Sequence, residues 1–189
     1  VTNPAAITLV EQVAFESTDP TGDVTVWGSN WKRSIVATEK RLYIGGHADV
    51  DLNSPVAPDE GIIDVLDISD PNGRLKIGAR IIVGGAILSR WQVDEWQGVL
   101  RVVSQRGVGR AVNGFGPPEV DTFQVDSALA IRPIGHLTMN LGHPEGLRAV
   151  RFDGTRAYAI TYATPQRTDP LFVIDLTNPA APRQRGELI

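Results

Sequence analysis

The stretch VLDISDPNGRLKIG at residues 65–78 returns as VIDLTNPAAPRQRG at residues 173–186. Both stretches carry an Asp, a Pro and a Gly at the same offsets, namely Asp67, Pro71 and Gly78 in the first and Asp175, Pro179 and Gly186 in the second. A third stretch, TFQVDSALAIRPIG at residues 122–135, fits the same frame without a gap, with Gln124 in the Asp position and Gly135 in the Gly position. A strand end, a turn and a new strand therefore recur about every 50 residues, and this period predicts a repeat architecture.

Short β-branched runs separated by Gly, Pro, Asn and Asp dominate the sequence, and helical periodicity is hard to find. We therefore expect an all-β fold, a partial β-propeller of four-stranded antiparallel blades, with about three and a half blades in this chain. All blades form one propeller domain, with the outer strands of a partial blade at residues 1–31 and complete blades at 32–85, 86–140 and 141–189. A non-repeating β-sandwich is the alternative.

The expected strands follow from the apolar runs and the turn residues between them. They lie at residues 34–38, 41–45, 62–68 and 76–83, at 87–93, 98–104, 120–125 and 131–137, and at 147–152, 156–163, 171–176 and 183–189, after two strands of the partial blade at 7–15 and 23–28. Tight hairpins are expected at 39–41, 96–98 and 153–155. The recurring Gly predicts a bulge or a close backbone approach. The recurring Asp67 and Asp175 predict a structural turn or an inter-blade hydrogen bond rather than chemistry.

The chain has 189 residues, of which 42% are apolar and 21% charged, and this composition is typical of a globular protein. Its net charge of −4 argues against general binding to nucleic acid or to an anionic membrane. No apolar run reaches the length of a membrane-spanning helix. The absence of Cys excludes disulfides and thiolate metal sites. Because the chain starts at Val1 without Met or a signal peptide, we expect a processed or trimmed product.

An open array of blades leaves unpaired strand edges, which promote aggregation. We therefore expect the terminal strands, near Val1 and Ile189, to be covered. The expected cover is a protein partner or a remaining part of the propeller in the same polypeptide. A four-bladed closure, in which another segment completes the partial unit, is a further alternative.

One family resemblance is carried by VRFDGTRAYAITY at residues 150–162 and TDPLFVIDLTNPAAPRQRGELI at residues 168–189. These stretches resemble the secreted bacterial and archaeal proteins with a C-terminal β-propeller domain distantly related to WD40 repeats. LSRWQVDEWQGVLRVVS at residues 88–104 is similar to another stretch of that family. The chain departs from the family at Asp153 and in the insert at 106–120. The resemblance implies a propeller fold and a secreted, cell-surface or periplasmic location, and it implies no catalytic residues.

The segment DVDLNSPVAPDE at residues 49–60 has the ligand spacing of a calcium loop, in which hard oxygens surround the ion and an acidic twelfth residue closes it. The expected ligands are Asp49, Asp51, Asn53, the carbonyl of Pro55, and Glu60. Ser54 stands where such loops have Gly, and the flanks are strand-like. We expect Ca²⁺ as a stabilising cofactor, with a solvated polar hairpin loop as the alternative.

A long connection at residues 106–118, rich in Gly and Arg, is a second candidate binding segment. The residues expected to grip an anionic ligand or a partner are Arg106, Arg110, Asn113 and Phe115. The alternative is a surface insertion without a ligand.

Isolated ionisable residues offer a weaker signal for catalysis. The strongest combination is His47 and His143 near loop ends, joined by Glu145 and Arg148 as an acid/base group. His136 shows no metal-ligand spacing with the other histidines. The adjacent acids Asp94 and Glu95 should point to opposite faces of a strand, and a solvated turn is their default role.

These observations favour an exported propeller module with a non-catalytic role in protein binding, ligand binding or scaffolding, because no catalytic motif is present. One alternative is a propeller enzyme, a hydrolase or lyase with its site at the channel mouth. It would require His47, Asp94, Glu95 and His143 to share one pocket. Another alternative is a structural subunit of a cell-surface assembly.

Overall fold

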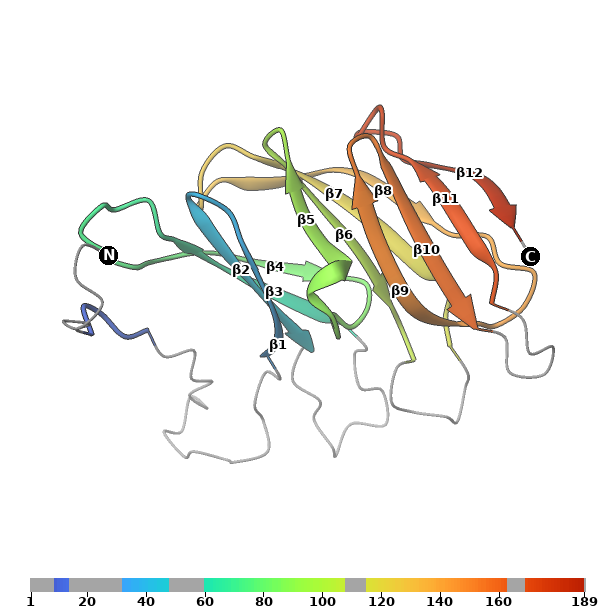
Figure 1. Cartoon of the computed structure of the whole chain (residues 1–189), viewed down its shortest axis with the longest axis horizontal. Helices are drawn as coiled ribbons and strands as arrows, with labels where there is room; N and C mark the ends of the chain where they lie inside the picture. The colour runs from blue at the N-terminus through green and yellow to red at the C-terminus, as the bar shows by residue number, and fades with distance from the viewer. Residues whose placement is uncertain (1–8, 14–31, 48–59, 108–114, 163–168, 189) are drawn as a thin grey trace.

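The computed structural model describes residues 9–13, 32–47, 60–107, 115–162 and 169–188. These residues form three four-stranded antiparallel sheets that lie side by side (Figure 1). The first blade comprises β1 (Lys32–Ala37), β2 (Arg41–His47), β3 (Gly61–Asp67) and β4 (Lys76–Val83). The second comprises β5 (Val93–Trp96), β6 (Val99–Gln105), β7 (Pro118–Val125) and β8 (Ile131–Thr138), and the third comprises β9 (Gly146–Asp153), β10 (Arg156–Tyr162), β11 (Leu171–Asp175) and β12 (Arg183–Leu188).

Each blade is a simple meander, because every strand pairs with the next one along the chain. The prediction of an all-β, partial propeller with four-stranded blades is confirmed, and a two-layer sandwich is not seen in the described residues. Almost all of the partial blade predicted at residues 1–31 lies outside the described residues.

One predicted strand is wrong. The segment 87–93 was expected to be extended, whereas residues Arg90–Gln92 form a short 3-10 helix, η1, and β5 begins at Val93. The cause is a polar side chain: the amide oxygen of Gln92 accepts hydrogen bonds from the N–H groups of Leu88 and Ser89 at 2.8 and 2.9 Å. This capping arrangement competes with strand pairing and turns the chain before β5.

The expected hairpins are present. Gln97 and Gly98 connect β5 to β6 with φ of 52° and 75°, and Gly154 connects β9 to β10 with φ of 53°. Two-residue hairpins favour such positive φ values because their twist matches that of the strands. Gln97 is the one non-glycine residue with positive φ in the described part of the chain.

Two apolar cores lie between the blades rather than inside them. The first core joins the first and second blades through Tyr43, Ile63, Val65, Ile81, Val83, Ile87, Val93, Leu100, Val102, Phe123, Val125 and Ala128. The second joins the second and third blades through Val103, Val120, Met139, Val150, Ala157, Ala159, Phe172, Ile174 and Leu176. Alternate residues of the second blade therefore contribute to opposite cores, as β-strand geometry requires.

The recurring turn has the structural role expected of it. The side chain of Asp67 accepts a hydrogen bond from the N–H of Ser69 at 2.9 Å, and Asp175 accepts one from Thr177 at the same distance. The fourth strand bulges at the recurring glycine in all three blades. The half-buried Asp175 has its pKa lowered to about 2, first by its hydrogen bonds with Thr177 and then by Arg185.

Candidate functional site

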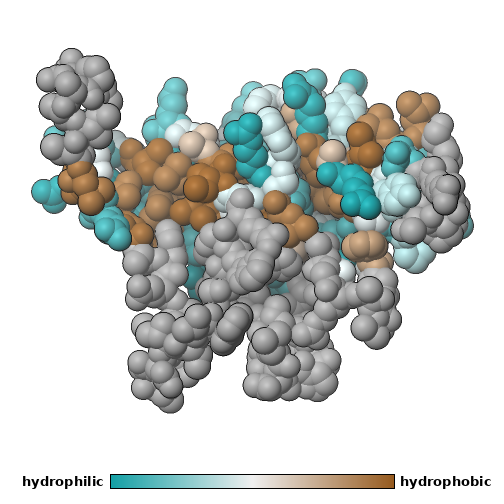
Figure 2. Space-filling view, turned by 60° about the horizontal axis from the view of Figure 1, so that its bottom comes forward, coloured by the Kyte–Doolittle hydropathy of each residue, from teal (hydrophilic) through white to brown (hydrophobic). Residues whose placement is uncertain are grey.

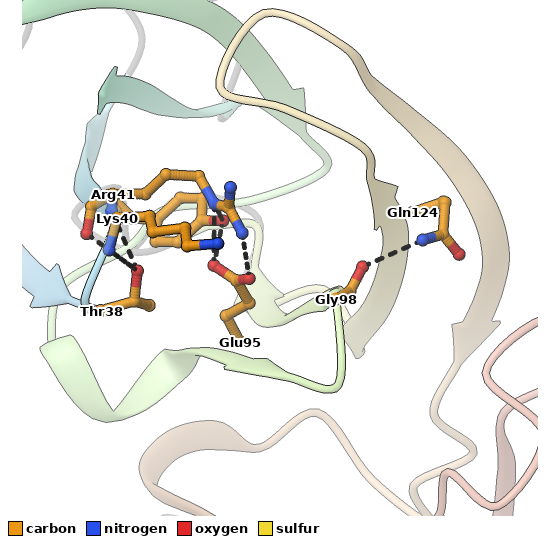
Figure 3. Close-up of polar contacts among 7 residues, drawn as sticks. Thr38, Lys40, Arg41, Glu95, Gly98 and Gln124 are labelled. Atoms are coloured by element: carbon orange, nitrogen blue, oxygen red, sulfur yellow. Dashed lines mark hydrogen bonds and ion pairs between the residues drawn. The ribbon is translucent and has the colours of Figure 1, made fainter. Parts of the chain in front are cut away.

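The junction of the first and second blades contains a buried polar cluster, which we call the clamp, made of Arg41, Tyr43 and Glu95. Figure 3 shows the contact between Arg41 and Glu95. Arg41 and Tyr43 come from β2 of the first blade, and Glu95 comes from β5 of the second. The Arg41 guanidinium donates to both carboxylate oxygens of Glu95, at 2.5 and 3.1 Å, and the Tyr43 hydroxyl donates to one of them at 2.6 Å. Only 9% of the Glu95 side chain is exposed.

The charges and protonation states of the clamp residues complement one another. Burial by itself raises the pKa of Glu95, but the hydrogen bonds from Arg41 and Tyr43 outweigh it, so this pKa lies below its usual range. Burial and then the hydrogen bond to Glu95 raise the pKa of Tyr43, so the hydroxyl keeps its proton. A carboxylate held by an arginine and a protonated phenol joins two blades and is unsuited to proton transfer.

The neighbouring acid, Asp94, points the other way, as expected for adjacent strand residues. It accepts hydrogen bonds from Arg101, whose side chain is 3% exposed. Arg101 also donates to the carbonyl of Gly154 in the third blade, and its guanidinium lies 5.0 Å from the Phe152 ring centre. Glu95 therefore joins the first and second blades, whereas Asp94 pairs within the second blade with Arg101, which itself reaches the third. The two acids do not form an acid/base pair.

The first strands of all three blades line a common groove of about 550 Å³, which we call the axial groove. Its lining residues are Ile35, Val36 and Ala37 from β1, Arg90 and Trp91 from η1, Val93 and Asp94 from β5, and Arg151 and Phe152 from β9. Trp91 is 54% exposed, and the Arg90 guanidinium lies 4.3 Å from its ring centre. Exposed isoleucines occur on the first blade, and Figure 2 shows apolar residues gathered on that side of the molecule.

A second cavity, of about 680 Å³, lies mainly between β4 of the first blade and β7 and β8 of the second. Asp121 and His136 line it, and together with Glu119 they offer three ligand atoms within 4.8 Å of one another. Two carboxylates and an imidazole suit a divalent transition metal. Both ring nitrogens of His136 already have partners, because Nδ1 lies 2.8 Å from Asp121 and Nε2 lies 3.2 Å from Thr138. Asp121 and His136 are therefore hydrogen-bonded to each other, whereas the second carboxylate oxygen of Asp121 is buried without a hydrogen-bond partner.

Sequence reasoning missed this cluster because the three residues are spread over two strands. The available signal was the alternation of Glu119 and Asp121 on β7, combined with the hairpin register that places His136 opposite Asp121.

The model of the family described as "Beta propeller domain" matches residues 2–189. The chain belongs to this family. The propeller is also similar to an uncharacterized protein of Methanocaldococcus jannaschii, with 40% identity over 106 residues, which is 56% of this chain and 16% of the relative. An uncharacterized protein of Archaeoglobus fulgidus is 35% identical over 56% of this chain and 15% of its own length. The match thus spans less than a fifth of each of these curated relatives.

Most of the predicted calcium loop lies outside the described residues, including Asp49, Asp51, Asn53 and Pro55. Glu60 is described and is half-buried directly before β3. Because the other four expected ligands are not described, the calcium site stays a prediction.

The second predicted binding segment of the propeller is described only at its two ends. Arg106 is exposed, with its Nε 3.7 Å from a carboxylate oxygen of Glu119, and Phe115 packs against Gly146 at the start of β9. Arg110 and Asn113 lie outside the described residues.

Two of the candidate acid/base residues, Glu145 and Arg148, already have other partners. His143 is exposed, and buried Glu145 accepts a hydrogen bond from Thr161. Arg148 stacks on the Tyr162 ring at 5.0 Å. His47 ends β2, and its side chain lies outside the described part. Within the described part, no helix is long and apolar enough to cross a membrane.

Proposed function

We propose that this propeller is a non-catalytic binding module whose axial groove receives an acidic polypeptide segment or another anionic ligand. The observation that carries the proposal is the exposed Trp91 with Arg90 stacked on it, in a groove where the first strands of three blades meet. Exposed aromatic rings supply a large contact area, and Arg supplies bidentate recognition of carboxylates.

The charges of the groove favour an anion. Arg90 and Arg151 are exposed there, whereas Asp94, the acid among the lining residues, is paired with Arg101. At the blade junctions, Glu95 is paired with Arg41 and Asp94 with Arg101, and charges that are paired in this way support binding over catalysis.

Binding of an anionic ligand to the axial groove can be tested with acidic and basic polymers. Poly-L-glutamate should quench the tryptophan fluorescence of the protein saturably, and poly-L-lysine should not. Trp91→Phe should remove most of the signal change, and Arg90→Gln should weaken binding by about tenfold, the effect of losing a charged contact worth about 1.4 kcal/mol. Unchanged binding by an Arg90→Gln, Arg151→Gln double variant would place the ligand elsewhere.

We also propose that the module is exported, on the strength of its resemblance to secreted propeller proteins. Cell fractionation of the source organism with an antibody to the chain tests this, and recovery from the cytoplasm alone would oppose it.

The calcium loop at residues 49–60 is proposed as a stabilising element of the exported module. Millimolar CaCl₂ should raise the melting temperature by several degrees, because a ligand that binds only the folded state stabilises it. Equimolar MgCl₂ should do much less, since Mg²⁺ needs a tighter octahedral shell. Glu60→Gln should abolish the calcium effect, and Glu187→Gln on the exposed β12 is the matched control. An equal calcium response in all three proteins would refute the site.

A further inference from the structure

The two blade junctions share a backbone contact at the recurring glycine. A Cβ added to Gly78 would lie 2.4 Å from the carbonyl oxygen of Ala128 in the second blade. A Cβ added to Gly135 would lie 2.2 Å from the carbonyl oxygen of Pro179 in the third blade. Ala128 and Pro179 occupy the same position of the repeated turn. Each glycine therefore makes room for the turn of the following blade.

Gly186 is the third member of this set, and it stands in open space. A Cβ added there would meet nothing within 4 Å. The strand of Gly186 has the same bulge as the strands of Gly78 and Gly135. Its backbone therefore has the geometry for a contact with a turn carbonyl, but the described residues do not make that contact.

The third blade also repeats the arginine and tyrosine of the clamp. Arg156 and Tyr158 pair with Asp175 and Val173, in the same register in which Arg41 and Tyr43 pair with Asp67 and Val65. Arg41 and Tyr43 hold Glu95 of the following blade. Neither Arg156 nor Tyr158 has a hydrogen-bond or ion-pair partner in the described structure.

The apolar side chains around these positions are also less buried than their counterparts in the first blade. Val65 and Ile63 of the first blade are fully buried, at 0% exposure, against the second blade. Val173 and Leu171, which have the same repeat positions, are only half-buried, and Ile160 beside them is 36% exposed. The third blade therefore has an apolar sheet face beside Arg156 and Tyr158, which lack the carboxylate that Glu95 supplies to the clamp. Such a face is suited to packing against another sheet.

We propose that this face of the third blade, defined by Arg156, Tyr158, Val173 and Gly186, docks a fourth propeller blade. The incoming blade places a turn carbonyl over Gly186 and a carboxylate, at the position of Glu95 in the second blade, between Arg156 and Tyr158. The proposal does not depend on the axial groove.

A second copy of this chain fits the face poorly. Its first blade has Ala37 where the second blade has Glu95, because Ala37 pairs with Leu42 as Glu95 pairs with Leu100. The side of β3 that would face an incoming sheet is also already covered, with Ile62 and Leu66 buried. The occupant is therefore a blade of different sequence with an acid near the end of its first strand.

A chain extension tests this chemistry. Ile189 has the repeat position of Ile81, so a second copy of residues 82–140, fused directly after Ile189, continues the frame and supplies its own Glu95 and Ala128. The extension should slow amide exchange of residues 156–162 and 183–188 at least about tenfold and raise the melting temperature by about 5 °C.

Three variants identify the contacts. Within the extended chain, Gly186→Val and Arg156→Ala should each remove most of the added protection, as should Glu95→Ala in the appended copy alone. In the unextended chain, Gly186→Val should melt within about 1 °C of the parent, which shows that the substitution does not impair folding.

Two results would overturn the proposal. One is unchanged exchange of residues 183–188 in an extended chain whose appended blade is folded. The other is a dimer of the unextended chain in light scattering that Gly186→Val dissociates, because the occupant would then be a second copy.

Discussion

Gly135→Val should lower the free energy of unfolding by about 3 kcal/mol or more, because the new side chain overpacks a blade junction. A Cβ at residue 135 would lie 2.2 Å from the carbonyl oxygen of Pro179 and 2.8 Å from Oγ1 of Thr122. The nearest atom is a backbone carbonyl oxygen in a turn where the Asn178 side chain accepts a hydrogen bond from the N–H of Ala180, so it cannot rotate away as a flexible side chain could. Urea unfolding followed by circular dichroism measures the loss.

The matched control is Gly186→Val. This residue has the same repeat position and the same bulge, but open space surrounds it in the described structure. Its free energy of unfolding should change by less than about 0.5 kcal/mol. If the two variants lose equal stability, the cost comes from the bulge itself and not from the contact between blades.

Glu95→Ala should cost about 3 kcal/mol, because it leaves the Arg41 guanidinium and the buried Tyr43 hydroxyl without their shared acceptor. The control is Asp126→Ala, which removes an exposed ion pair of 3.8 Å with Arg132 and should cost less than about 0.5 kcal/mol. Chemical unfolding at neutral pH gives both values. Equal losses at the two positions would show that the clamp behaves as a surface ion pair.

The clamp also predicts a pH dependence. Because the pKa of Glu95 is lowered in the folded state, its ionised form stabilises the fold, and this contribution to the free energy of unfolding is fully present above the pKa of an unfolded glutamate. The contribution is lost as the pH falls through the folded-state pKa. The stability difference between the parent and Glu95→Ala should therefore be constant near neutrality and shrink in acid. A difference that grows on acidification would contradict the assignment.

Local sequence patterns predicted the strands well where turn chemistry marks them. The turn after β3 and the turn after β11 begin with the same Asp, and both side chains accept a hydrogen bond from the residue two positions on. The short helix before β5 was missed because Gln92, a polar residue in an apolar run, folds back on the N–H groups of Leu88 and Ser89. A hydrogen bond from the backbone to a side chain cannot be predicted from the alternation of apolar residues.

The candidate site was less predictable. The opposite directions of Asp94 and Glu95 follow from strand geometry. Arg101, the partner of Asp94, lies opposite it in the β5–β6 hairpin, whereas Arg41, the partner of Glu95, depends on how the blades pack. The grouping of Glu119, Asp121 and His136 needed the register of the β7–β8 hairpin. The axial groove needed three blades at once, because its lining comes from β1, η1, β5 and β9.

The sequence by itself determined the repeat, the all-β class and the place of each recurring Asp and Gly, because these depend on interactions between residues close in the chain. Only the tertiary structure decided why the glycines recur. Gly78 and Gly135 each lie under a carbonyl of the next blade, about 50 residues further along the chain, and Gly186 lies under none in the described residues. That contact depends on the distance between sheets, which no local pattern contains.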